Sequence, residues 1–518
     1  MFALCGNECF DFSEDFMKKY RLLSALIALL LLFGTLSGAV WAEPEEVSGD
    51  ESAAQTEETL ETAAPTDAEE GSNRPVFRDY STLFAADEYT ANCKAALLIE
   101  RNSNTVIYSL HPTDQMYPAS LTKIMTCLVA IEKCAERGKS LDDLVTVSAS
   151  AFADMDPAGS TAGIQPGDVI SLRELLYCMM IESANESCNI VAEYLAGDVD
   201  TYVSWMNERA KELGCGGTHF ANTHGLHDPN HYTTAEDLAI ITEKALEDEL
   251  FRTIVESASY TVEAEQYSGE RSLHSTNYLI REAFPEYYYA KARGVKTGYT
   301  SAAGRCLITT ASDGNLDLLA VVLGTQDDEY AADGLRYRSF VEAKNLLEYG
   351  FDHVDYVQVL SKLDLTAQVV VTNGDVSSVV LYPSEDLDCL LPQDYDKELI
   401  TTSWTLDGNA TKLDAPLEAG QKVGTITVYY QNVAVGSTAL ETLTEVRERT
   451  SVENVVAGTS DFFKDTLPNF LRSYWWIFPA LLGLIVLLFI ALIVRNNLLR
   501  RRRREQLRRR RQQQNREQ

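Results

Sequence analysis

A serine and a lysine stand three residues apart in the stretch YPASLTKIMT, residues 117–126. A serine hydroxyl is a weak nucleophile at neutral pH and needs a neighbouring base to take its proton. Positions i and i+3 share one face of a helix, and Pro118 suits the first turn of a helix. If a helix begins there, the Lys123 amine lies beside the Ser120 hydroxyl. The pattern S-x-x-K is short, so alone it also fits a helix start with a solvated lysine.

Two further short motifs follow along the chain. Ser-Ala-Asn occupies residues 183–185, at an expected break between two helices, and Lys-Thr-Gly occupies residues 296–298, at the start of an expected strand. One class of serine acyl-enzymes uses S-x-x-K, S-x-N and K-T-G in this order. Each motif alone is weak, but the three in order predict such an enzyme.

Acyl transfer explains why these residue types are needed. Lys123 must be neutral to accept the proton of Ser120, and burial or a nearby cation such as Lys296 lowers the pKa of a lysine. Ser183 can relay a proton to the leaving amine. Asn185 can hold both Lys123 and a substrate amide. Backbone N–H groups would stabilise the oxyanion, which is usually the largest electrostatic contribution.

The Lys-Thr-Gly motif offers contacts to a substrate. Thr297 presents a hydroxyl to a substrate carboxylate. Gly298 lets a substrate backbone lie close to the strand edge, which a Cβ atom would hinder.

The beginning of the chain indicates export. A basic cluster and the apolar run 22–40 precede Ala42, with small residues at the usual positions before a cleavage site. We expect the signal region 1–42 to be cleaved after Ala42, and a retained helix is the alternative. Met17 directly precedes the basic cluster, so translation starts at either Met1 or Met17.

The end of the chain indicates a membrane anchor. Residues 475–494 are twenty residues without a charge, and at about 1.5 Å per residue they span about 30 Å of hydrocarbon. With the interfacial Tyr474, the predicted transmembrane helix covers 474–494. The tail 495–518 holds eleven Arg and two Glu, which places it in the cytoplasm by the positive-inside rule. The body of this single-pass protein of the cell membrane is therefore expected outside.

Nucleic-acid binding by the basic tail is the weaker alternative, because the tail directly follows a membrane span. The net charge of −33 for the whole chain also argues against a nucleic-acid partner.

Composition divides the remaining chain into four segments. The segment 43–75 begins with 43–73, which holds eleven acids and no base, and is expected to be a disordered spacer. Residues 76–353 carry strand patterns at both ends and helical patterns between them, which predicts an α+β domain. Short β-like runs predict a small all-β domain over 354–447. A juxtamembrane connector covers 448–473.

Within the α+β domain, the patterns predict individual elements. They are a strand pair joined at 102–104, a helix after the first motif, two helices with a break near Ser183, a strand pair meeting at 313–314 and a closing amphipathic helix over 338–351.

Cysteine and histidine clusters do not predict a metal site. Eight cysteines follow the signal region without a C-x-x-C pair; they suit core positions, or pairing after export, and their pairing is left open. Four of the seven histidines lie between residues 219 and 231. Their spacing fits no standard zinc pattern, and Gly, Pro and Asn make the stretch a loop. We therefore predict no metal and no cofactor.

The sequence resembles the D-alanyl-D-alanine carboxypeptidases among the low-molecular-mass penicillin-binding proteins, over about residues 80–450. Beyond the three motifs, the resemblance rests on HGLHDPNHYTTAEDLA at 224–239, AKNLLEYGF at 343–351 and PLEAGQKVGTITVY at 416–429. It implies a β-lactamase/transpeptidase-like α+β catalytic domain followed by the all-β domain. It also implies a peptidoglycan stem peptide as substrate and β-lactams as covalent inhibitors.

The resemblance also implies a role for each motif residue. Ser120 would be the acylated nucleophile and Lys123 the general base. Tyr299 departs from the family, where this residue is often His, although only its backbone N–H should contribute to the oxyanion hole. Arg338 best matches a family Arg that binds the terminal carboxylate, and Arg336 is the alternative. The implied residues are the catalytic Ser120, Lys123, Ser183 and Asn185 and the substrate-binding Lys296, Thr297, Gly298, Tyr299 and Arg338.

The resulting hypothesis is an anchored carboxypeptidase that removes the terminal D-Ala from stem pentapeptides outside the cytoplasm. A catalytically weak sensor or scaffold for wall peptide or β-lactam is a second hypothesis, which the intact motifs oppose. A β-lactamase is a third, but class A enzymes use an added Glu, and no E-x-x-L-N stretch lies between Ser183 and Lys296. Hydrolysis is favoured over cross-linking, because no domain that could hold a glycan strand precedes Ser120. The oligomeric state and the preferred stem peptide stay open.

Overall fold

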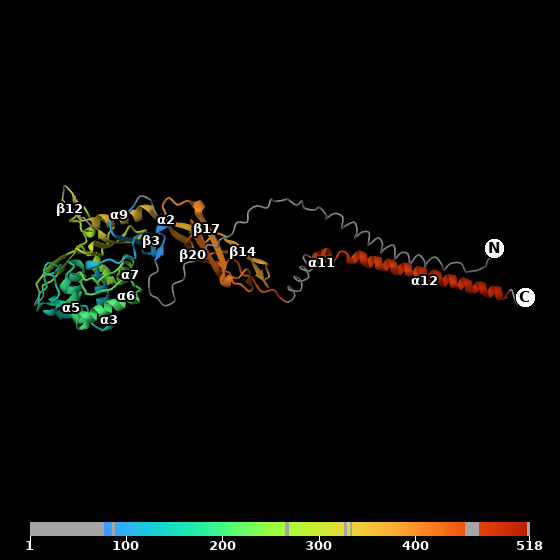
Figure 1. The fold of residues 1–518 in the computed structure, drawn as a ribbon, viewed down its shortest axis with the longest axis horizontal. Coiled ribbons are helices and arrows are strands. Elements are labelled where there is room, and N and C mark those ends of the chain that lie inside the picture. Colours follow the sequence, from blue (N-terminus) through green and yellow to red (C-terminus); the bar gives the residue numbers. More distant parts are fainter. Residues whose placement is uncertain are drawn as a thin grey trace, which may run out of the picture. The chain divides into compact units, whose positions relative to one another are not determined.

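The computed structural model describes residues 77–84, 89–264, 269–325, 329–331, 334–450 and 466–514 (Figure 1). The expected signal region, the acidic spacer and the middle of the connector lie outside the described residues.

The first domain is built on a six-stranded sheet with the strand order β1-β3-β2-β10-β9-β8. All neighbours are antiparallel except β1 and β3. Both predicted strand pairs are present, and β10 pairs with β2, so strands from the two ends of the domain meet in one sheet. The strands are β1 Arg78–Asp79, β2 Ala95–Glu100, β3 Thr105–Leu110, β8 Lys296–Thr300, β9 Gly304–Ser312 and β10 Asp317–Thr325.

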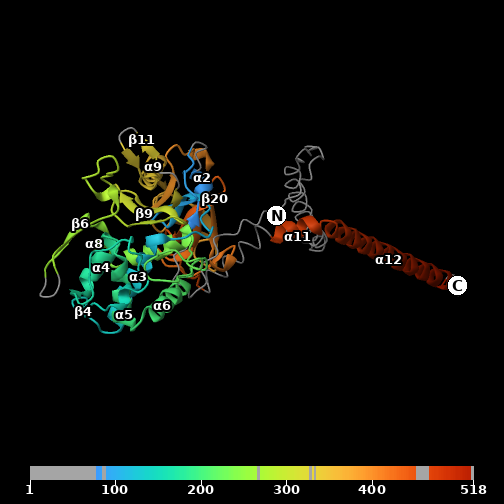
Figure 2. The ribbon, with the colours of Figure 1, turned by 60° about the vertical axis from the view of Figure 1, so that its left-hand side comes forward.

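Helices cover both faces of this sheet. Successive side chains of a strand point to opposite faces. Along β10, Leu319 and Val321 pack into the core shared with the helices that follow the first motif, whereas Leu318 and Val322 pack into the core shared with α9. Burial on both sides explains the unbroken apolar run of this strand. Figure 2 shows α3, α4, α5, α6 and α8 grouped on one side of the domain and α9 on the other.

Local signals set the limits of the helices around the second motif. The Ser171 side chain accepts from the Glu174 N–H while the Glu174 carboxylate accepts from the Ser171 N–H, a capping box that starts α4. Gly197 adopts a left-handed φ of 95° and ends α5. The helices are α3 Thr122–Glu136, α4 Leu172–Ile181, α5 Asn185–Ala196, α6 Val199–Glu212, α7 Ala235–Leu246, α8 Glu249–Glu256 and α9 Arg338–His353.

Short elements complete the first domain. They are α2 Ser81–Phe84, the 3-10 turns η1 Ala119–Leu121, η2 Ser150–Phe152 and η3 Tyr278–Ile280, and the strand pairs β4 Leu144–Thr146 with β5 Val169–Ser171, β6 Ser259–Val262 with β7 Arg271–His274, and β11 Glu329–Ala331 with β12 Gly334–Arg336.

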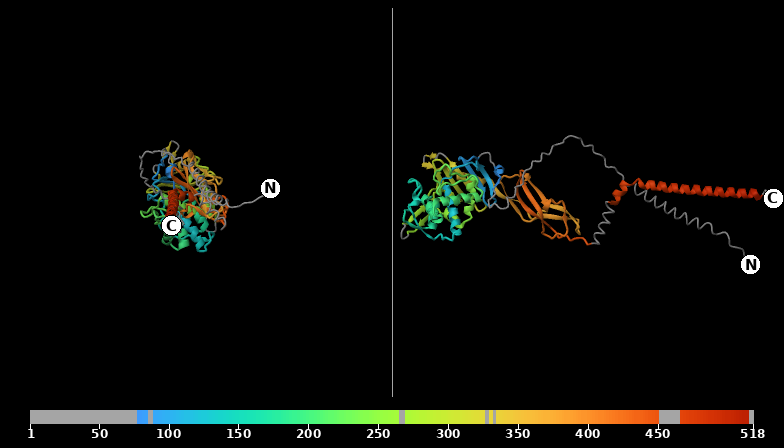
Figure 3. Two further views of the ribbon diagram at one scale, coloured as in Figure 1. Left: turned by 90° about the vertical axis from the view of Figure 1, so that its right-hand side faces the viewer. Right: turned by 60° about the horizontal axis from the view of Figure 1, so that its bottom comes forward.

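The second domain consists of strands, drawn in orange in Figure 3. Its main sheet has the order β17-β19-β20-β15-β14-β18, and β13 pairs with β16. Alternate residues of β19, such as Ile426 and Val428, are buried in its core. The strands are β13 Val354–Leu360, β14 Ala367–Thr372, β15 Ser378–Pro383, β16 Leu387–Pro392, β17 Ile400–Leu406, β18 Leu413–Asp414, β19 Lys422–Tyr430 and β20 Val433–Thr442, with 3-10 turns η4 Lys397–Leu399 and η5 Asp407–Asn409.

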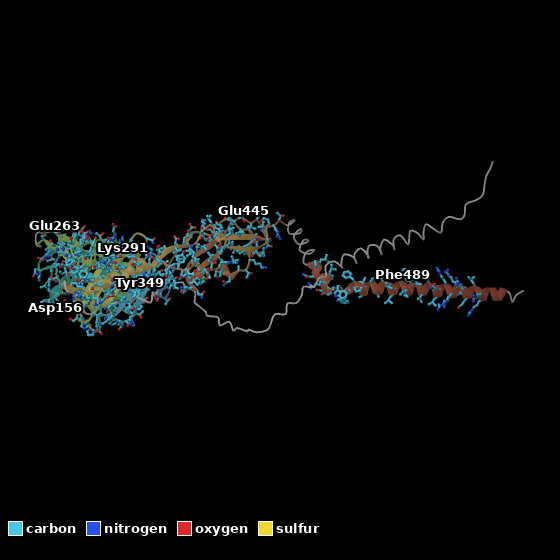
Figure 4. All side chains as sticks on the ribbon, turned by 90° about the horizontal axis from the view of Figure 1, so that it is seen from above. Asp156, Glu263, Lys291, Tyr349, Glu445 and Phe489 are labelled. Carbon is cyan, nitrogen blue, oxygen red and sulfur yellow. The ribbon has the colours of Figure 1, made fainter. Side chains whose placement is uncertain are left out.

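Two helices end the described chain, α11 Leu467–Ser473 and α12 Ile477–Gln514. Within the described residues, α12 is the one helix that is long and apolar enough to cross a membrane. The side-chain nitrogens of its arginines gather beyond the apolar part that includes Phe489 (Figure 4). The expected span begins at Tyr474, but α12 begins at Ile477, after a short turn at 474–476.

Candidate active site

A cavity of about 870 Å³ opens where the three motifs meet. The 3-10 turn η1, the junction between α4 and α5, and the strand β8 each contribute to its wall. The motif residues that line it are Ser120, Ser183, Asn185, Thr297, Gly298 and the adjacent Tyr299. The fold therefore brings together residues that are up to about 180 positions apart in the sequence.

Ser120 lies in η1, immediately before α3. The sequence predicts instead that Ser120 lies in the first turn of the α-helix itself. Ala119 has a left-handed φ of 49°, which interrupts regular helix between Pro118 and α3. The Thr122 hydroxyl donates to the Ala119 carbonyl at 2.8 Å and closes the turn.

Lys123 is fully buried on the first turn of α3. Its Nζ donates to Ser120 Oγ at 3.1 Å, to Asn185 Oδ1 at 2.8 Å and to the His224 carbonyl at 2.6 Å. Burial lowers the pKa of Lys123 because the charged ammonium loses its hydration. A lysine with a lowered pKa, within hydrogen-bond distance of a serine, is a suitable general base.

The second motif lies at the break between α4 and α5. Ser183 has a left-handed φ of 63° and is buried at the cavity wall. Asn185 begins α5, and its N–H donates to the Ser160 carbonyl at 2.9 Å. A Cβ atom on Gly159 would lie 2.7 Å from Asn185 Nδ2, so this glycine permits the close approach of the 156–163 segment to the amide.

The third motif forms the start of β8 beside the nucleophile. Thr297 Oγ1 lies 2.6 Å from Thr276 Oγ1. A Cβ atom on Gly298 would lie 3.0 Å from the Pro118 carbonyl and 3.2 Å from the Ser120 nitrogen. Glycine at this position therefore lets the edge strand and the nucleophile turn pack closely.

Lys296 is buried, and its Nζ donates to the Thr297 carbonyl at 3.0 Å. Burial holds the pKa of Lys296 well below its usual value, and the charge of Lys123 lowers it further. The sequence suggests that Lys296 is the cation that lowers the pKa of Lys123. In the structure, burial is the largest cause for both lysines.

Of the two predicted carboxylate contacts, Arg338 lies on α9 and pairs with Glu342 at 3.6 Å. Arg338 does not line the cavity, whereas Arg305, which no motif indicates, does. The side chain of Arg336 lies outside the described residues. Tyr299 lines the cavity and is 58% exposed.

The histidine-rich loop supports the nucleophile turn. His231 Nδ1 accepts from the Ala221 N–H at 3.0 Å, so its Nε2 donates to the Thr122 hydroxyl at 2.7 Å. A Cβ atom on Gly225 would lie 1.9 Å from the Ala119 carbonyl. The sequence shows a loop here but gives no sign of this packing, because it depends on a contact between distant segments. The described residues contain no group of three or more His, Cys, Asp or Glu that could hold a metal.

Like Arg305, Glu186 belongs to the surroundings of the cavity although no motif indicates it. It is buried directly after Asn185, and its Oε1 accepts from the Thr161 hydroxyl at 2.6 Å and from the Ala162 N–H at 2.8 Å. These bonds tie the 156–163 segment, which forms one wall of the cavity, to the second motif.

The fold and the site define a class of protein. A serine with a buried lysine beside it, an asparagine on that lysine and a glycine-containing strand edge against the serine form the constellation of the S-x-x-K serine hydrolases. An α+β domain carries this constellation, and an all-β domain follows it.

Comparison with known proteins identifies the family within this class. Residues 82–327 match the family model described as D-alanyl-D-alanine carboxypeptidase, and residues 355–448 match the C-terminal domain of penicillin-binding protein 5. The chain is 30% identical over 345 residues to the D-alanyl-D-alanine carboxypeptidase DacF of Bacillus subtilis, covering 65% of this chain and 82% of that protein. It is 31% identical over 376 residues to DacC of Escherichia coli, covering 71% and 88%.

Solved structures agree with this assignment. Penicillin-binding protein 5 from Haemophilus influenzae matches with a TM-score of 0.54 at 26% identity, over 70% of this chain and 100% of that chain. Penicillin-binding protein 6B from Escherichia coli matches with a TM-score of 0.52 at 26% identity, over 69% and 97%. The chain belongs to the D-alanyl-D-alanine carboxypeptidase family and is a serine hydrolase.

Proposed function

We propose that this enzyme removes the terminal D-Ala from peptidoglycan stem pentapeptides through an acyl-enzyme on Ser120. The observation that carries the proposal is the contact between Lys123 Nζ and Ser120 Oγ at 3.1 Å, made by a buried lysine whose pKa is lowered. The relatives DacF and DacC are D-alanyl-D-alanine carboxypeptidases, which supports this reaction class.

In the proposed reaction, neutral Lys123 takes the Ser120 proton while Oγ attacks the carbonyl carbon of the D-Ala-D-Ala bond. The backbone N–H groups of Ser120 and Tyr299 stabilise the oxyanion. The C–N bond breaks, and the proton held by Lys123 passes through Ser183 to the departing amine of D-Ala. Water then attacks the ester carbonyl and loses one proton to Lys123; the bond to Oγ breaks, the tetrapeptide leaves with the hydroxyl, and Lys123 passes that proton to Ser120 Oγ. A β-lactam would acylate Ser120 by the same first step and so inhibit the enzyme.

The catalytic domain is placed outside the cytoplasm, anchored by the apolar part of α12, with the arginine tail inside. The length and the apolar composition of α12, and the arginines that follow its apolar part, support this orientation. Protease added outside intact cells should reach the β-domain and leave the tail intact. Cleavage of the tail from outside would reverse the topology.

Incubation of the full-length protein in detergent with a pentapeptide tests the reaction. The wild type and Ser204→Ala, which alters an exposed serine on α6, should release D-Ala and leave tetrapeptide. Ser120→Ala should release none and should lose labelling by a fluorescent penicillin. Labelling without D-Ala release in the wild type would favour a sensor, and rapid hydrolysis of the penicillin would favour a β-lactamase.

A further inference from the structure

His224 contacts two different partners through its backbone and its side chain. Its carbonyl oxygen accepts from Lys123 Nζ at 2.6 Å, the shortest of the three hydrogen bonds of that amine. Its imidazole is buried, and Nε2 lies 3.2 Å from Oδ2 of Asp154, a carboxylate that lines the cavity. One residue therefore joins the amine beside the nucleophile to a carboxylate on the cavity wall.

The hydrogen bonds of the imidazole fix its protonation. The Leu226 N–H donates to Nδ1 of His224 at 3.2 Å, so Nδ1 carries no proton and Nε2 donates to Asp154. Burial lowers the pKa of His224 and keeps the ring neutral. The hydrogen bond from His224 holds the pKa of Asp154 below its usual value. The pair is therefore a neutral imidazole that donates to an ionised carboxylate, and this bond sets the orientation of the ring.

Asp154 is itself held by a second, buried donor. Its Oδ1 accepts from Asn189 Nδ2 at 2.8 Å, and Asn189 Oδ1 accepts from the Thr223 hydroxyl at 2.6 Å. Asn189 lies on α5, the helix that begins with Asn185 of the second motif. The carboxylate is therefore tied both to that helix and to the residue that precedes His224.

The backbone around His224 is held by further bonds. The Thr126 hydroxyl donates to the Thr223 carbonyl at 2.6 Å, and Thr126 lies on α3, the helix that carries the proposed general base. The peptide unit that contains the His224 carbonyl also contains the Gly225 N–H, which donates to Asn222 Oδ1 at 2.7 Å. These bonds shape the turn, and the imidazole bond fixes the turn against the wall of the cavity.

Loss of the carboxylate would leave the buried Nε2–H of His224 without its acceptor. A buried donor without a partner is unfavourable, so the ring would be expected to move toward another acceptor or toward water. The backbone that bears the ring would move with it, and the carbonyl on Lys123 belongs to that backbone.

We propose that Asp154 and His224 are positioning residues for the general base of the reaction. The Asp154 carboxylate holds the imidazole of His224, and the held imidazole keeps the His224 carbonyl on Lys123 Nζ, so that the amine stays directed at Ser120. The inference rests on the proposed function, since it concerns the base of that reaction.

Substitution of Asp154 in the full-length protein tests the first step of this chain, with kcat and KM for D-Ala release from a pentapeptide as the measured quantities. Asp154→Ala should lower kcat by roughly 10- to 100-fold and leave KM within about threefold of the wild type, because a displaced base slows the chemistry and not the binding. Asp154→Asn keeps the shape of the side chain and one accepting oxygen, so its kcat should fall only by roughly 3- to 10-fold.

Matched histidine variants test the second step. His224→Leu removes the N–H and should lose as much kcat as Asp154→Ala. His224→Gln places an N–H near the position of Nε2 and should recover part of the loss. The double variant of Asp154→Ala and His224→Leu should be no slower than either single variant, because both changes break the same bond. His219→Leu makes the same change at an exposed histidine of the same loop and should keep the wild-type kcat.

Several results would overturn the proposal. A raised KM with an unchanged kcat in Asp154→Ala would mean that Asp154 binds the peptide, and additive losses in the double variant would mean that the two residues act separately. Wild-type kcat in Asp154→Asn would also contradict it, which keeps the test decisive if the larger changes prevent folding. Acylation of Ser120 by a fluorescent penicillin uses the same base without a peptide. Slower acylation in Asp154→Ala would therefore support the positioning role even if the wild type released no D-Ala, a result that would overturn the proposed function alone.

Discussion

The two folded domains differ in the side chains that they bury. The first domain buries two lysines and several carboxylates, among them Lys123, Lys296 and Glu186, whereas the polar side chains buried in the described part of the β-domain are Thr438 and Thr442. Burying a charge without full compensation destabilises a fold by several kcal/mol. The first domain therefore carries buried charges at the cavity where the three motifs meet, whereas the described core of the β-domain is apolar apart from two threonine hydroxyls.

The largest expected effect comes from the buried lysine beside the nucleophile. Lys123→Ala should lower kcat by roughly 10²- to 10⁴-fold, the usual contribution of a general base. D-Ala release from a pentapeptide measures it. Lys133→Ala, on the same helix but in a partly exposed pair with Glu136, should leave kcat unchanged. Similar losses in both variants would mean that burial does not distinguish the catalytic lysine.

The next effect tests the close packing of β8 against the nucleophile turn. A Cβ atom in Gly298→Ala would meet the Pro118 carbonyl and the Ser120 nitrogen. The resulting displacement should lower kcat/KM by roughly 10²-fold, since small misplacements of reacting groups have effects of this size. Gly216→Ala is the control, because no atom lies within 4 Å of its Cβ position. Unchanged acylation by penicillin in Gly298→Ala would contradict the packing argument.

In the β-domain, we expect a core substitution to lower stability and to leave the activity of the enzyme unchanged. Leu440 on β20 is fully buried in its core, so Leu440→Ala should lower the free energy of unfolding of this domain by about 2–5 kcal/mol. Urea unfolding followed by circular dichroism measures the loss, and kcat/KM should stay the same. Val370→Ala, at a residue 55% exposed on β14, is the control. A matching loss of activity in Leu440→Ala would erase the contrast between the domains.

The smallest effect is a pH dependence of stability in the first domain. Burial lowers the pKa of His231 from 6.5 to about 3. Between these values the unfolded chain binds a proton that the folded chain does not, so stability rises with pH in this window and is lost as the pH falls below 6.5. Lowering the pH from 7.5 to 5.5 should remove about 1.3 kcal/mol through this histidine.

Unfolding free energies at the two pH values measure the contribution of His231. The loss should be smaller by that amount in His231→Gln and unchanged in His274→Gln, which alters an exposed histidine on β7. An identical loss in the wild type and in His231→Gln would show that this histidine is not the titrating group.

Local pattern was enough to predict much of the fold. The strand pairs on either side of residues 102–104 and 313–314 and the helix break near Ser183 follow from periodicity and turn residues, and all are present. The sheet order was not predictable from these patterns, because the pairing of β10 with β2 joins segments that are distant in the sequence. The separate 3-10 turn at Ser120 was also missed, since it depends on the loop that packs against Ala119.

The site shows the same division between local and distant information. The three motifs gave the residues that the cavity brings together, because each motif is a local pattern. The Arg305 guanidinium is placed by cross-strand register with Tyr299, and no spacing in the sequence records that register. Arg338, the carboxylate contact predicted from the sequence, pairs with Glu342 on α9 and is not among the residues that line the cavity, and its role stays a prediction.

The three hydrogen bonds of Lys123 have a consequence that follows from counting protons. A charged ammonium has three N–H groups, and the structure offers it three oxygens, those of Ser120, Asn185 and His224. A neutral amine has two N–H groups and one lone pair. The amide oxygen of Asn185 and the carbonyl oxygen of His224 can only accept hydrogen bonds, so the two N–H groups of neutral Lys123 point at them. The lone pair is then left facing Ser120, the one partner of the three that carries a transferable proton, and the direction of proton transfer is set before a substrate arrives.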